Sequence, residues 1–315
     1  MSLFQGWADA PSTGAYDEQE VSDVFKQSIA QTIWLPFATK KKIESGYTFT
    51  VPILSDLDEP TSSELNEETS IPLDKLTITA KTISLTERGR GVQVTKKNMQ
   101  RSPIELLNAH RTRLAEQMSL DMDTVLGAAF QSGQLKYAAT GASSYGLATA
   151  GSFTSAALSN ANFYHIRKMR DLAFRTYFMP KLGTGKYAFV CSTASYRGIL
   201  DDPEFLEINA PQNSSIFQGN SAGTLAGVDI YEDNHALADN VGTNSDVGEG
   251  VFISRDAVYF GVLDEPSIRF DASENSVATD FGRFISLAWR GDWGAGTSTD
   301  SGSAGFARLF HFGSS

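Results

Sequence analysis

The fold is decided by residues 76–133, LTITAKTISLTERGRGVQVTKKNMQRSPIELLNAHRTRLAEQMSLDMDTVLGAAFQSG, where a strand pattern runs into a long helix pattern. Residues 76–85 alternate apolar and polar side chains, and residues 92–95 continue the alternation, which is typical of a strand. Upstream, residues 47–54 (YTFTVPIL) alternate in the same way, and Pro52 marks an edge or an end. The two strands predict a long hairpin with an open polar tip. A long loop and a lone two-stranded ribbon are both unusual in a compact domain, and both are explained if the hairpin lies on a neighbouring subunit.

The helix that follows the hairpin has a complete start signal. Ser102 is a favourable N-cap, Pro103 occupies the first helical position, and Glu105 completes a Ser-x-x-Glu capping box. Apolar side chains then recur in steps of seven and four on one stripe, at Leu107, Leu114, Met118, Val125 and Ala129. With Gly133 as the stop, about 30 residues would span roughly 45 Å. We interpret this helix as a spine of the molecule.

The rest of the chain predicts an arm before the hairpin and a strand-rich body after the spine. Residues 1–20 show little periodicity, and residues 21–35 predict a short helix that ends near Pro36. Residues 138–155 are small and glycine-rich and predict a loop or hinge. Two further helices are expected at 160–178 and 193–200, and strands at 186–191, 224–231 (a pair with a turn at Gly227), 251–254, 258–262, 267–270, 281–290 and 306–312. The expected class is α+β, without an internal repeat.

The composition excludes several classes of protein. The chain has 315 residues, of which 41% are hydrophobic and 20% charged, as is ordinary for a protein that buries a core. No run approaches the roughly 18 apolar residues of a membrane span, and we expect no signal peptide. The single cysteine, Cys191, excludes an intrachain disulfide and a cysteine-built metal site. The net charge of −11 argues against tight nucleic-acid binding, which needs a basic surface.

The charge is unevenly distributed, and one contrast predicts a contact between copies. Residues 188–315 carry 6 Lys or Arg against 18 Asp or Glu. Residues 55–75 have Lys75 as their one base and seven acids: Asp56, Asp58, Glu59, Glu64, Glu67, Glu68 and Asp74. Residues 86–113 have two acids, Glu87 and Glu105, and seven bases: Arg88, Arg90, Lys96, Lys97, Arg101, Arg111 and Arg113. Two solvated faces are the simpler interpretation. The sharper hypothesis is an intersubunit contact between the first six of these acids and the first five of these bases.

A search for catalytic or ligand-binding chemistry finds little. The four histidines are not at metal-ligand spacing: His110, His165, His235 and His311. The turn 183–186 (GTGK) lacks the rest of a phosphate-binding loop, so a tight turn before a strand is favoured. Asp229, Glu232 and Asp233 could bind a divalent cation, but a solvated turn is the simpler interpretation. Cys191 ends an apolar strand and is interpreted as buried and inert. We therefore predict no catalytic, cofactor-binding or metal-binding residue.

The order of these elements resembles that of tailed-phage major capsid proteins with the HK97 fold. Residues 85–98 (LTERGRGVQVTKKN), running into the spine, resemble the end of that family's extended hairpin, the E-loop. Three further stretches resemble the family's peripheral-domain helix and its entry into the axial domain: 162–172 (NFYHIRKMRDL), 187–192 (YAFVCS) and 196–203 (YRGILDDP). Residues 222–231 (AGTLAGVDIY) resemble a strand of the axial domain. The likeness extends from about residue 21 to 290 and is closest to the N4-like branch.

The resemblance implies an HK97-like capsid fold in five parts. These are an N-terminal arm with a short helix (1–45), the E-loop hairpin (46–98), the spine helix with the peripheral domain (99–185), a β-rich axial domain with return strands to the peripheral domain (186–290), and a C-terminal tail (291–315). It implies a structural protein whose hexamers and pentamers form an icosahedral head shell around double-stranded DNA, without sequence-specific binding, cofactor or membrane. Portal, scaffolding and cement proteins are further candidate partners. The expected location is the virion, after assembly in the host bacterial cytoplasm.

Two alternatives stay open at this point. The first is a capsid-fold compartment shell, similar to encapsulins, that would store an enzyme. The second, less favoured, is a metal-dependent enzyme that would use Asp229, Glu232 and Asp233.

Overall fold

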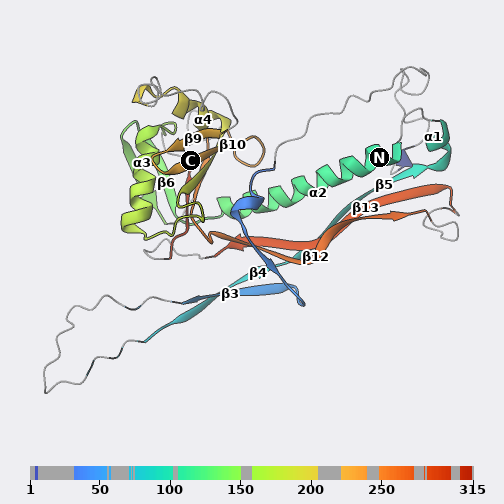
Figure 1. The fold of residues 1–315 in the computed structure, drawn as a ribbon, viewed down its shortest axis with the longest axis horizontal. Helices are drawn as coiled ribbons and strands as arrows, with labels where there is room; N and C mark the ends of the chain where they lie inside the picture. The colour runs from blue at the N-terminus through green and yellow to red at the C-terminus, as the bar shows by residue number, and fades with distance from the viewer. Residues whose placement is uncertain are drawn as a thin grey trace.

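The computed structural model describes residues 4–5, 32–54, 57, 71, 73, 75–101, 106–149, 158–204, 221–239, 248–272, 280, 282–298 and 306–313. Over these residues the protein is a strand-rich α+β molecule with one long helix and one projecting hairpin (Figure 1). Within this part of the chain, no helix is long and apolar enough to cross a membrane.

One half of the molecule is a five-stranded sheet with the spine helix α2 lying along it (Figure 1). The sheet has the order β1-β5-β13-β12-β2, and its strands are Phe4–Gln5 (β1), Thr86–Thr95 (β5), Phe284–Thr297 (β13), Val258–Asp271 (β12) and Thr39–Lys42 (β2). The helix α2 spans Leu106–Gln131 and confirms the predicted spine. Its buried Leu126 and Phe130 share one core with Trp289 and Trp293 of β13. The start signal at 102–105 lies outside the described residues, and a short helix α1 (Lys96–Arg101) precedes it.

The other half is a seven-stranded sheet whose central strands are buried on both faces. Its order is β7-β6-β14-β11-β8-β10-β9, with strands Ser144–Ala148 (β7), Lys136–Gly141 (β6), Leu309–Phe312 (β14), Gly250–Ile253 (β11), Tyr187–Ser192 (β8), Val228–Asp233 (β10) and Ser221–Leu225 (β9). In β8, Phe189 and Cys191 belong to a core that also contains side chains of α3 (Phe163–Asp171) and of α4 (Thr193–Leu200). Ala188 and Val190 belong to the core built around α2, β12 and β13. The continuous apolar run of β8 follows from this burial on both faces.

The hairpin is a separate two-stranded sheet that projects away from the body (Figure 1). Its strands β3 (Thr48–Leu54) and β4 (Ile78–Ser84) pair antiparallel, which confirms the two predicted strands. At the base of the hairpin a third core is formed by Ile43, Phe49, Val51, Ile83 and Leu85, which we call the root cluster. Three glycines of β12 and β13 lie against it, and a Cβ atom on any of them would collide with the hairpin: Gly261, Gly294 and Gly296. The close approach of the hairpin therefore requires glycine at these positions.

The chain that enters the hairpin is anchored on the C-terminal half of α2. The Oδ1 atom of Asp123 accepts the backbone N–H groups of Ile33 (3.0 Å) and Trp34 (2.9 Å). The Trp34 indole is fully buried and stacks on Phe130, with the ring centroids 5.1 Å apart. A 3₁₀ turn at Leu35–Phe37 then leads into β2 at the edge of the five-stranded sheet.

Two sequence expectations need correction. The stretch 138–155 is not simply a loop, because it contains most of β6 and all of β7, and residues 150–157 lie outside the described residues. Its small side chains suit a packed strand, since Ala139 is buried beside Tyr137 in the core under α3. The predicted helix at 21–35 is not helical at 32–34, and its earlier part lies outside the described residues.

Several other elements agree with the sequence, and the structure adds to them. The helix expected at 160–178 is α3 followed by a π-helical turn η3 (Leu172–Thr176), and the helix at 193–200 is α4. The strand pair with a turn at Gly227 is β9 and β10. The strands expected at 251–254 and 258–262 exist, but the short link between them carries the chain from one sheet to the other. The last strand, β14, lies between β6 and β11 inside the seven-stranded sheet.

Candidate assembly surfaces

The acidic residues considered as a cation site serve the seven-stranded sheet instead. Asp229 of β10 forms an ion pair with Lys186 at 3.0 Å. Asp233 is buried, and its Oδ2 accepts the backbone N–H groups of Ala236 (2.7 Å) and Leu237 (2.8 Å). Asp229, Glu232 and Asp233 all lie in the strand β10, so the interpretation as a solvated turn is wrong for the three residues. Among the described residues, no group of three His, Cys, Asp or Glu side chains is placed to hold a metal ion.

The turn before β8 is a tight turn, as predicted, and not a phosphate-binding loop. The N–H of Gly185 donates to the carbonyl of Leu182 (2.8 Å), and the N–H of Leu182 donates to that of Lys186 (2.9 Å). The Nζ of Lys186 donates to Thr224 Oγ1 (2.7 Å) and to Asp229 Oδ1 (3.0 Å). The lysine that a phosphate would need is therefore engaged within the sheet.

The His165 imidazole and the Cys191 thiol, which lie in the core with α3, have structural roles. His165 is fully buried, and its Nε2 lies 2.9 Å from the carbonyl oxygen of Gly141, so Nε2 carries the proton. Its Nδ1 then accepts from the Tyr137 hydroxyl at 3.0 Å, and burial lowers the pKa of His165. Burial also raises the pKa of the Cys191 thiol, which disfavours the reactive thiolate.

A cluster of titratable groups, of which His311 is buried and Lys136 and Glu249 are half-buried, lies where α2 leads into β6. The Nδ1 atom of His311 is 2.8 Å from Lys136 Nζ, and its Nε2 is 3.8 Å from Glu249 Oε1. Burial, and secondarily the charge of Lys136, lowers the pKa of His311 to about 3. Burial also lowers the pKa of Lys136 and raises that of Glu249. The imidazole is therefore neutral near neutral pH and accepts from the lysine, which links β6 to β14.

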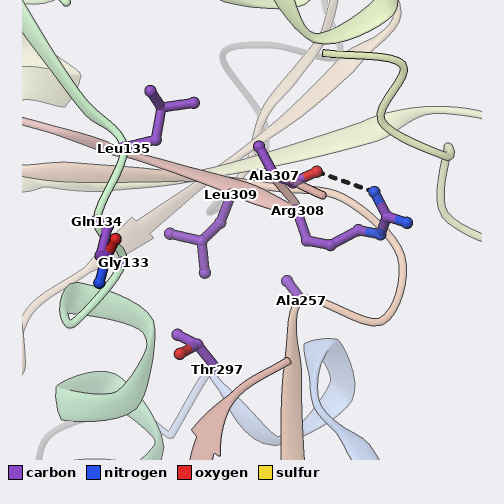
Figure 2. A pocket seen from close by; sticks show the side chains of 8 residues that line it. All are labelled: Gly133, Gln134, Leu135, Ala257, Thr297, Ala307, Arg308 and Leu309. Atoms are coloured by element: carbon purple, nitrogen blue, oxygen red, sulfur yellow. Dashed lines mark hydrogen bonds between the residues drawn. The ribbon is translucent and has the colours of Figure 1, made fainter. Parts of the chain in front are cut away.

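The cavity next to this cluster is too small for a substrate. Figure 2 shows it between the link from α2 to β6, the start of β12 and the residues that enter β14. Its volume of about 10 Å³ has room for one water molecule, whereas ligand pockets usually measure about 300–1,000 Å³. The Arg308 guanidinium beside it donates to the carbonyl of Ala307 at 3.0 Å (Figure 2).

The basic half of the predicted intersubunit contact lies on β5 and α1. Arg88 is half-buried and pairs with Asp121 of α2 at 3.5 Å, whereas Arg90, Lys97 and Arg101 are exposed and Lys96 is half-buried. The acidic half lies outside the described residues: Asp56, Asp58, Glu59, Glu64, Glu67 and Glu68. The structure therefore shows an accessible basic surface, and the contact itself stays a prediction.

The hairpin carries an apolar surface that the sequence interpretation missed. Leu54 and Ile78 lie directly opposite each other in the ribbon and are 58% and 69% exposed. Further towards the tip, Leu73 is 93% exposed. The apolar side chains of LDKLTI (residues 73–78) indicate this surface in the sequence. The many acids nearby led instead to the prediction of a charged contact. Exposed apolar patches of this kind mark surfaces that a partner covers.

A second unexpected surface lies at the end of α3. Phe174 and Phe178 are 64% and 68% exposed, although both follow a helix whose apolar face is already buried against the sheet. An alternation or helical stripe identifies the buried face of an element, so it gave no reason to expect large aromatic side chains on the outer face.

Comparisons with known proteins place the fold. The model of a family described as "Phage capsid protein" matches residues 79–308. No curated protein matches the chain. The capsid structure of cyanophage Pam1 is similar over 97% of this chain and 99% of its own, at 15% identity and a TM-score of 0.66. The acid-stable capsid of Helicobacter pylori bacteriophage KHP30 is similar over 98% and 97%, at 13% identity and a TM-score of 0.66. The capsid of cyanophage P-SCSP1u is similar over 93% and 90%, at 10% identity and a TM-score of 0.65.

Proposed function

This chain belongs to the phage capsid protein family and is a structural capsid protein, and from that premise we propose how it works in a virion. Copies of the chain form hexamers and pentamers of an icosahedral head shell, which encloses the double-stranded DNA of a tailed phage without reading its sequence. Assembly takes place in the host cytoplasm. Portal, scaffolding and cement proteins are candidate partners in this proposal.

The exposed apolar half of the hairpin carries this proposal. At the base, the side chains of the root cluster on one face of the ribbon pack against β12 and β13, so the hairpin is fixed to its own subunit there. Beyond the base, Leu54, Ile78 and Leu73 face solvent in the isolated chain. Burying such a side chain contributes roughly 1.5–3 kcal/mol. A neighbouring copy that covers this half of the ribbon would therefore gain stability that the isolated chain lacks.

Charge gives this contact its register in our proposal. The acidic stretch between the two strands contacts the basic surface of β5 and α1 on a neighbour. The support is the sequence contrast together with the exposure of Arg90, Lys97 and Arg101. Such charges select the partner and its orientation more than they add affinity. The apolar residues of the hairpin supply the larger share of the contact energy.

A structural role without catalysis fits the rest of the chain. The candidate cation ligands Asp229 and Asp233 are occupied within the seven-stranded sheet. The Cys191 thiol is buried, and the cavity beside β14 admits about one water. These observations support a protein whose function lies in its surfaces.

The finer divisions of the fold are part of the same proposal. We divide the chain into an arm (1–45), an E-loop hairpin (46–98), a spine with the peripheral domain (99–185), an axial domain with return strands (186–290) and a tail (291–315). Membership of the N4-like branch rests on the sequence resemblance. A comparison with capsid proteins of all branches tests it, and greater similarity to another branch would remove this placement.

Negative-stain electron microscopy of the purified chain tests the shell. We expect closed particles, and the double variant Leu54→Asn/Ile78→Asn should leave folded monomers or capsomers. The matched control is Thr50→Asn/Thr82→Asn, a facing pair on the same side of the ribbon but nearer its base. A wild-type chain that stays a compact monomer would refute the shell. Equal loss of particles in both variants would refute the role of the apolar pair. Small particles that carry an enzyme would favour the compartment shell.

The charge contact has its own test. Reversing Glu64, Glu67 and Glu68 to lysine should block assembly while leaving a folded monomer or capsomer. A second reversal of Arg90 and Lys97 to glutamate should restore particles to the first variant. Normal shells from the first variant, or no rescue by the second, would overturn the contact while leaving the capsid role intact.

A further inference from the structure

The helical rod formed by α3 and η3 ends on a residue that is unfavourable there. The N–H of Tyr177 donates to the carbonyl of Leu172 (3.0 Å), and the N–H of Met179 donates to that of Ala173 (2.8 Å). Phe178 stands between them with a φ of +51°. A helix that ends in this way usually has glycine at the left-handed position, because a Cβ atom there costs free energy. The chain therefore accepts strain at Phe178.

Burial of the Phe178 side chain does not offset that strain in the described part of the chain. The Phe178 side chain is 68% exposed, whereas Ala173 and Met179 on either side of the turn are buried in the core. One turn earlier, Phe174 is 64% exposed. Two large aromatic side chains thus lie on the outer face of this helix end, while the residues of its inner face are already buried in the core. Nothing in the described part of the subunit buries the two aromatic side chains, so a surface of another copy could do so.

Basic side chains lie beside the Phe174 ring, and Phe178 follows one turn later. The Nζ of Lys181 lies 5.7 Å from the centroid of the Phe174 ring. The side chains that we call the aromatic-basic patch are Lys168, Arg170, Phe174, Arg175, Phe178 and Lys181. Asp171 lines the same depression and pairs with Arg170 at 3.2 Å. An open depression of about 370 Å³ lies between Lys168, Phe174 and Arg175. The patch therefore presents apolar area, positive charge and a concave form.

The opposite end of the same rod has a small excess of acids, because Asp201, Asp202 and Glu204 lie there with the bases Arg167 and Arg197. The first turn of α3 is tied to the residues after α4, because the N–H of Phe163 donates to Asp202 Oδ2 (2.8 Å). Arg167 pairs there with Glu204 at 2.7 Å, and half of the Glu204 side chain remains exposed. Asp201 at the end of α4 is exposed as well. Figure 1 shows α4 on the far side of this half of the molecule from the β3–β4 hairpin. The rod of 14 residues, Phe163–Thr176, separates the two ends by roughly 20 Å.

We propose that the aromatic-basic patch of one copy receives the α4 end of the next copy, around Asp201 and Glu204, in each ring of the shell. The proposal rests on the proposed function and names the surfaces that close the ring. Two complementary surfaces at opposite ends of one element form a head-to-tail contact, which closes into rings when the rotation permits. The two phenylalanines supply buried aromatic area, and the charges set the register.

The variant Phe178→Gly separates this role from a structural one. Glycine relieves the left-handed strain, so the thermal midpoint of the unassembled subunit should stay the same or rise. Particle yield at equal protein concentration should fall roughly ten-fold or more, because a buried aromatic contact is lost at every interface of the ring. The combination of unchanged stability and lost assembly is not expected from a residue that only supports its own fold.

A charge exchange tests the named partner surface. Arg175→Asp should reduce particle yield, and the added change Asp201→Arg should restore it. The matched control is Phe270→Ala, which removes an exposed phenylalanine from β12 in the other half of the molecule. Equal loss in the control, normal assembly of Phe178→Gly, or no rescue by Asp201→Arg would overturn the proposal. So would a patch variant that assembles normally but loses binding to a double-stranded DNA fragment, because the patch would then be a nucleic-acid surface. Wild-type particles in the same experiment keep a failure here distinct from a failure of the capsid role.

Discussion

Replacing Phe49 by alanine tests how the hairpin is held on the body. The Phe49 side chain is 6% exposed and lies in the root cluster beside Val51 and Ile83. Its ring fills the space above Gly261 of β12, where a Cβ atom would collide with it. The root cluster is separate from the two larger cores of the molecule. The cost of the truncation should therefore fall on the docking of the hairpin.

The size of the effect follows from the burial. Truncation of a buried phenylalanine to alanine costs about 3–5 kcal/mol, the lost transfer energy plus the cavity that remains. Since about 1.4 kcal/mol corresponds to a factor of ten, the equilibrium for local opening of the hairpin should shift by roughly 100-fold or more. The seven-stranded sheet should keep its stability, because Phe49 belongs to neither of its cores.

Amide hydrogen exchange of the unassembled protein measures this difference. The backbone amides of β3 and β4 that bond across the ribbon should exchange roughly 100-fold faster in Phe49→Ala, while those of β8 stay unchanged. Thr50→Ala is the matched control, because Thr50 is the next residue of β3 and its side chain is exposed. Equal acceleration in β3 and β8 would show that the hairpin is not a separate unit. No acceleration in β3 would show that the root cluster does not hold it.

Three further predictions address other contacts. Gly294→Val should displace the hairpin by collision with the carbonyl of Ser84 and cost about 1–3 kcal/mol or more, which urea unfolding followed by hairpin-specific hydrogen exchange would detect. Asp123→Ala removes the acceptor for Ile33 and Trp34 and should cost about 1–3 kcal/mol, seen as faster proteolysis near residue 32, whereas Asp123→Asn keeps an acceptor and should be milder. His311 has a folded pKa of about 3, below its ordinary 6.5, so the unfolded chain takes up the proton first. Its contribution to stability is complete above pH 6.5 and falls by up to about 1.4 kcal/mol per pH unit towards pH 3. Burial raises the pKa of Glu249, which faces His311, so this carboxyl contributes a slope of the opposite sign. His311→Gln should therefore remove the part of the acid loss that His311 causes, and an identical slope would contradict the assignment.

The long elements could be predicted because each has one strong period. The stripe of α2 and the alternation in β3 and β4 depend on local sequence, and the structure confirms them. The pair β6–β7 was missed because its small, glycine-rich residues resemble a loop. Those strands are stabilised by neighbours distant in sequence: β14 pairs with β6 in parallel, and its residues follow β6 by more than 160 positions. No local pattern contains that information.

The surfaces were harder to predict than the fold. The local excess of basic residues at 86–113 indicated Arg90 and Lys97 as surface residues, and both are exposed. Exposure of Phe174 and Ile78 was not expected, because hydrophobic side chains count as core in any periodicity argument. Recognising them as surface residues requires knowing that the neighbouring positions already complete the buried face. That knowledge comes only from the packed structure.

The core around α2 joins the two sheets and has a consequence for the shell that we propose, with its rings of five and of six. Val190 and Val251 of one sheet share this core with Phe260 and Leu287 of the other, so bending the subunit between its halves would open dense packing. The hairpin, by contrast, is held on the body by the few side chains of the root cluster, which pack against glycines of β12 and β13. We expect the change of curvature from one ring type to the other to be absorbed by a swing of the ribbon, while the bulk of each subunit keeps a single shape.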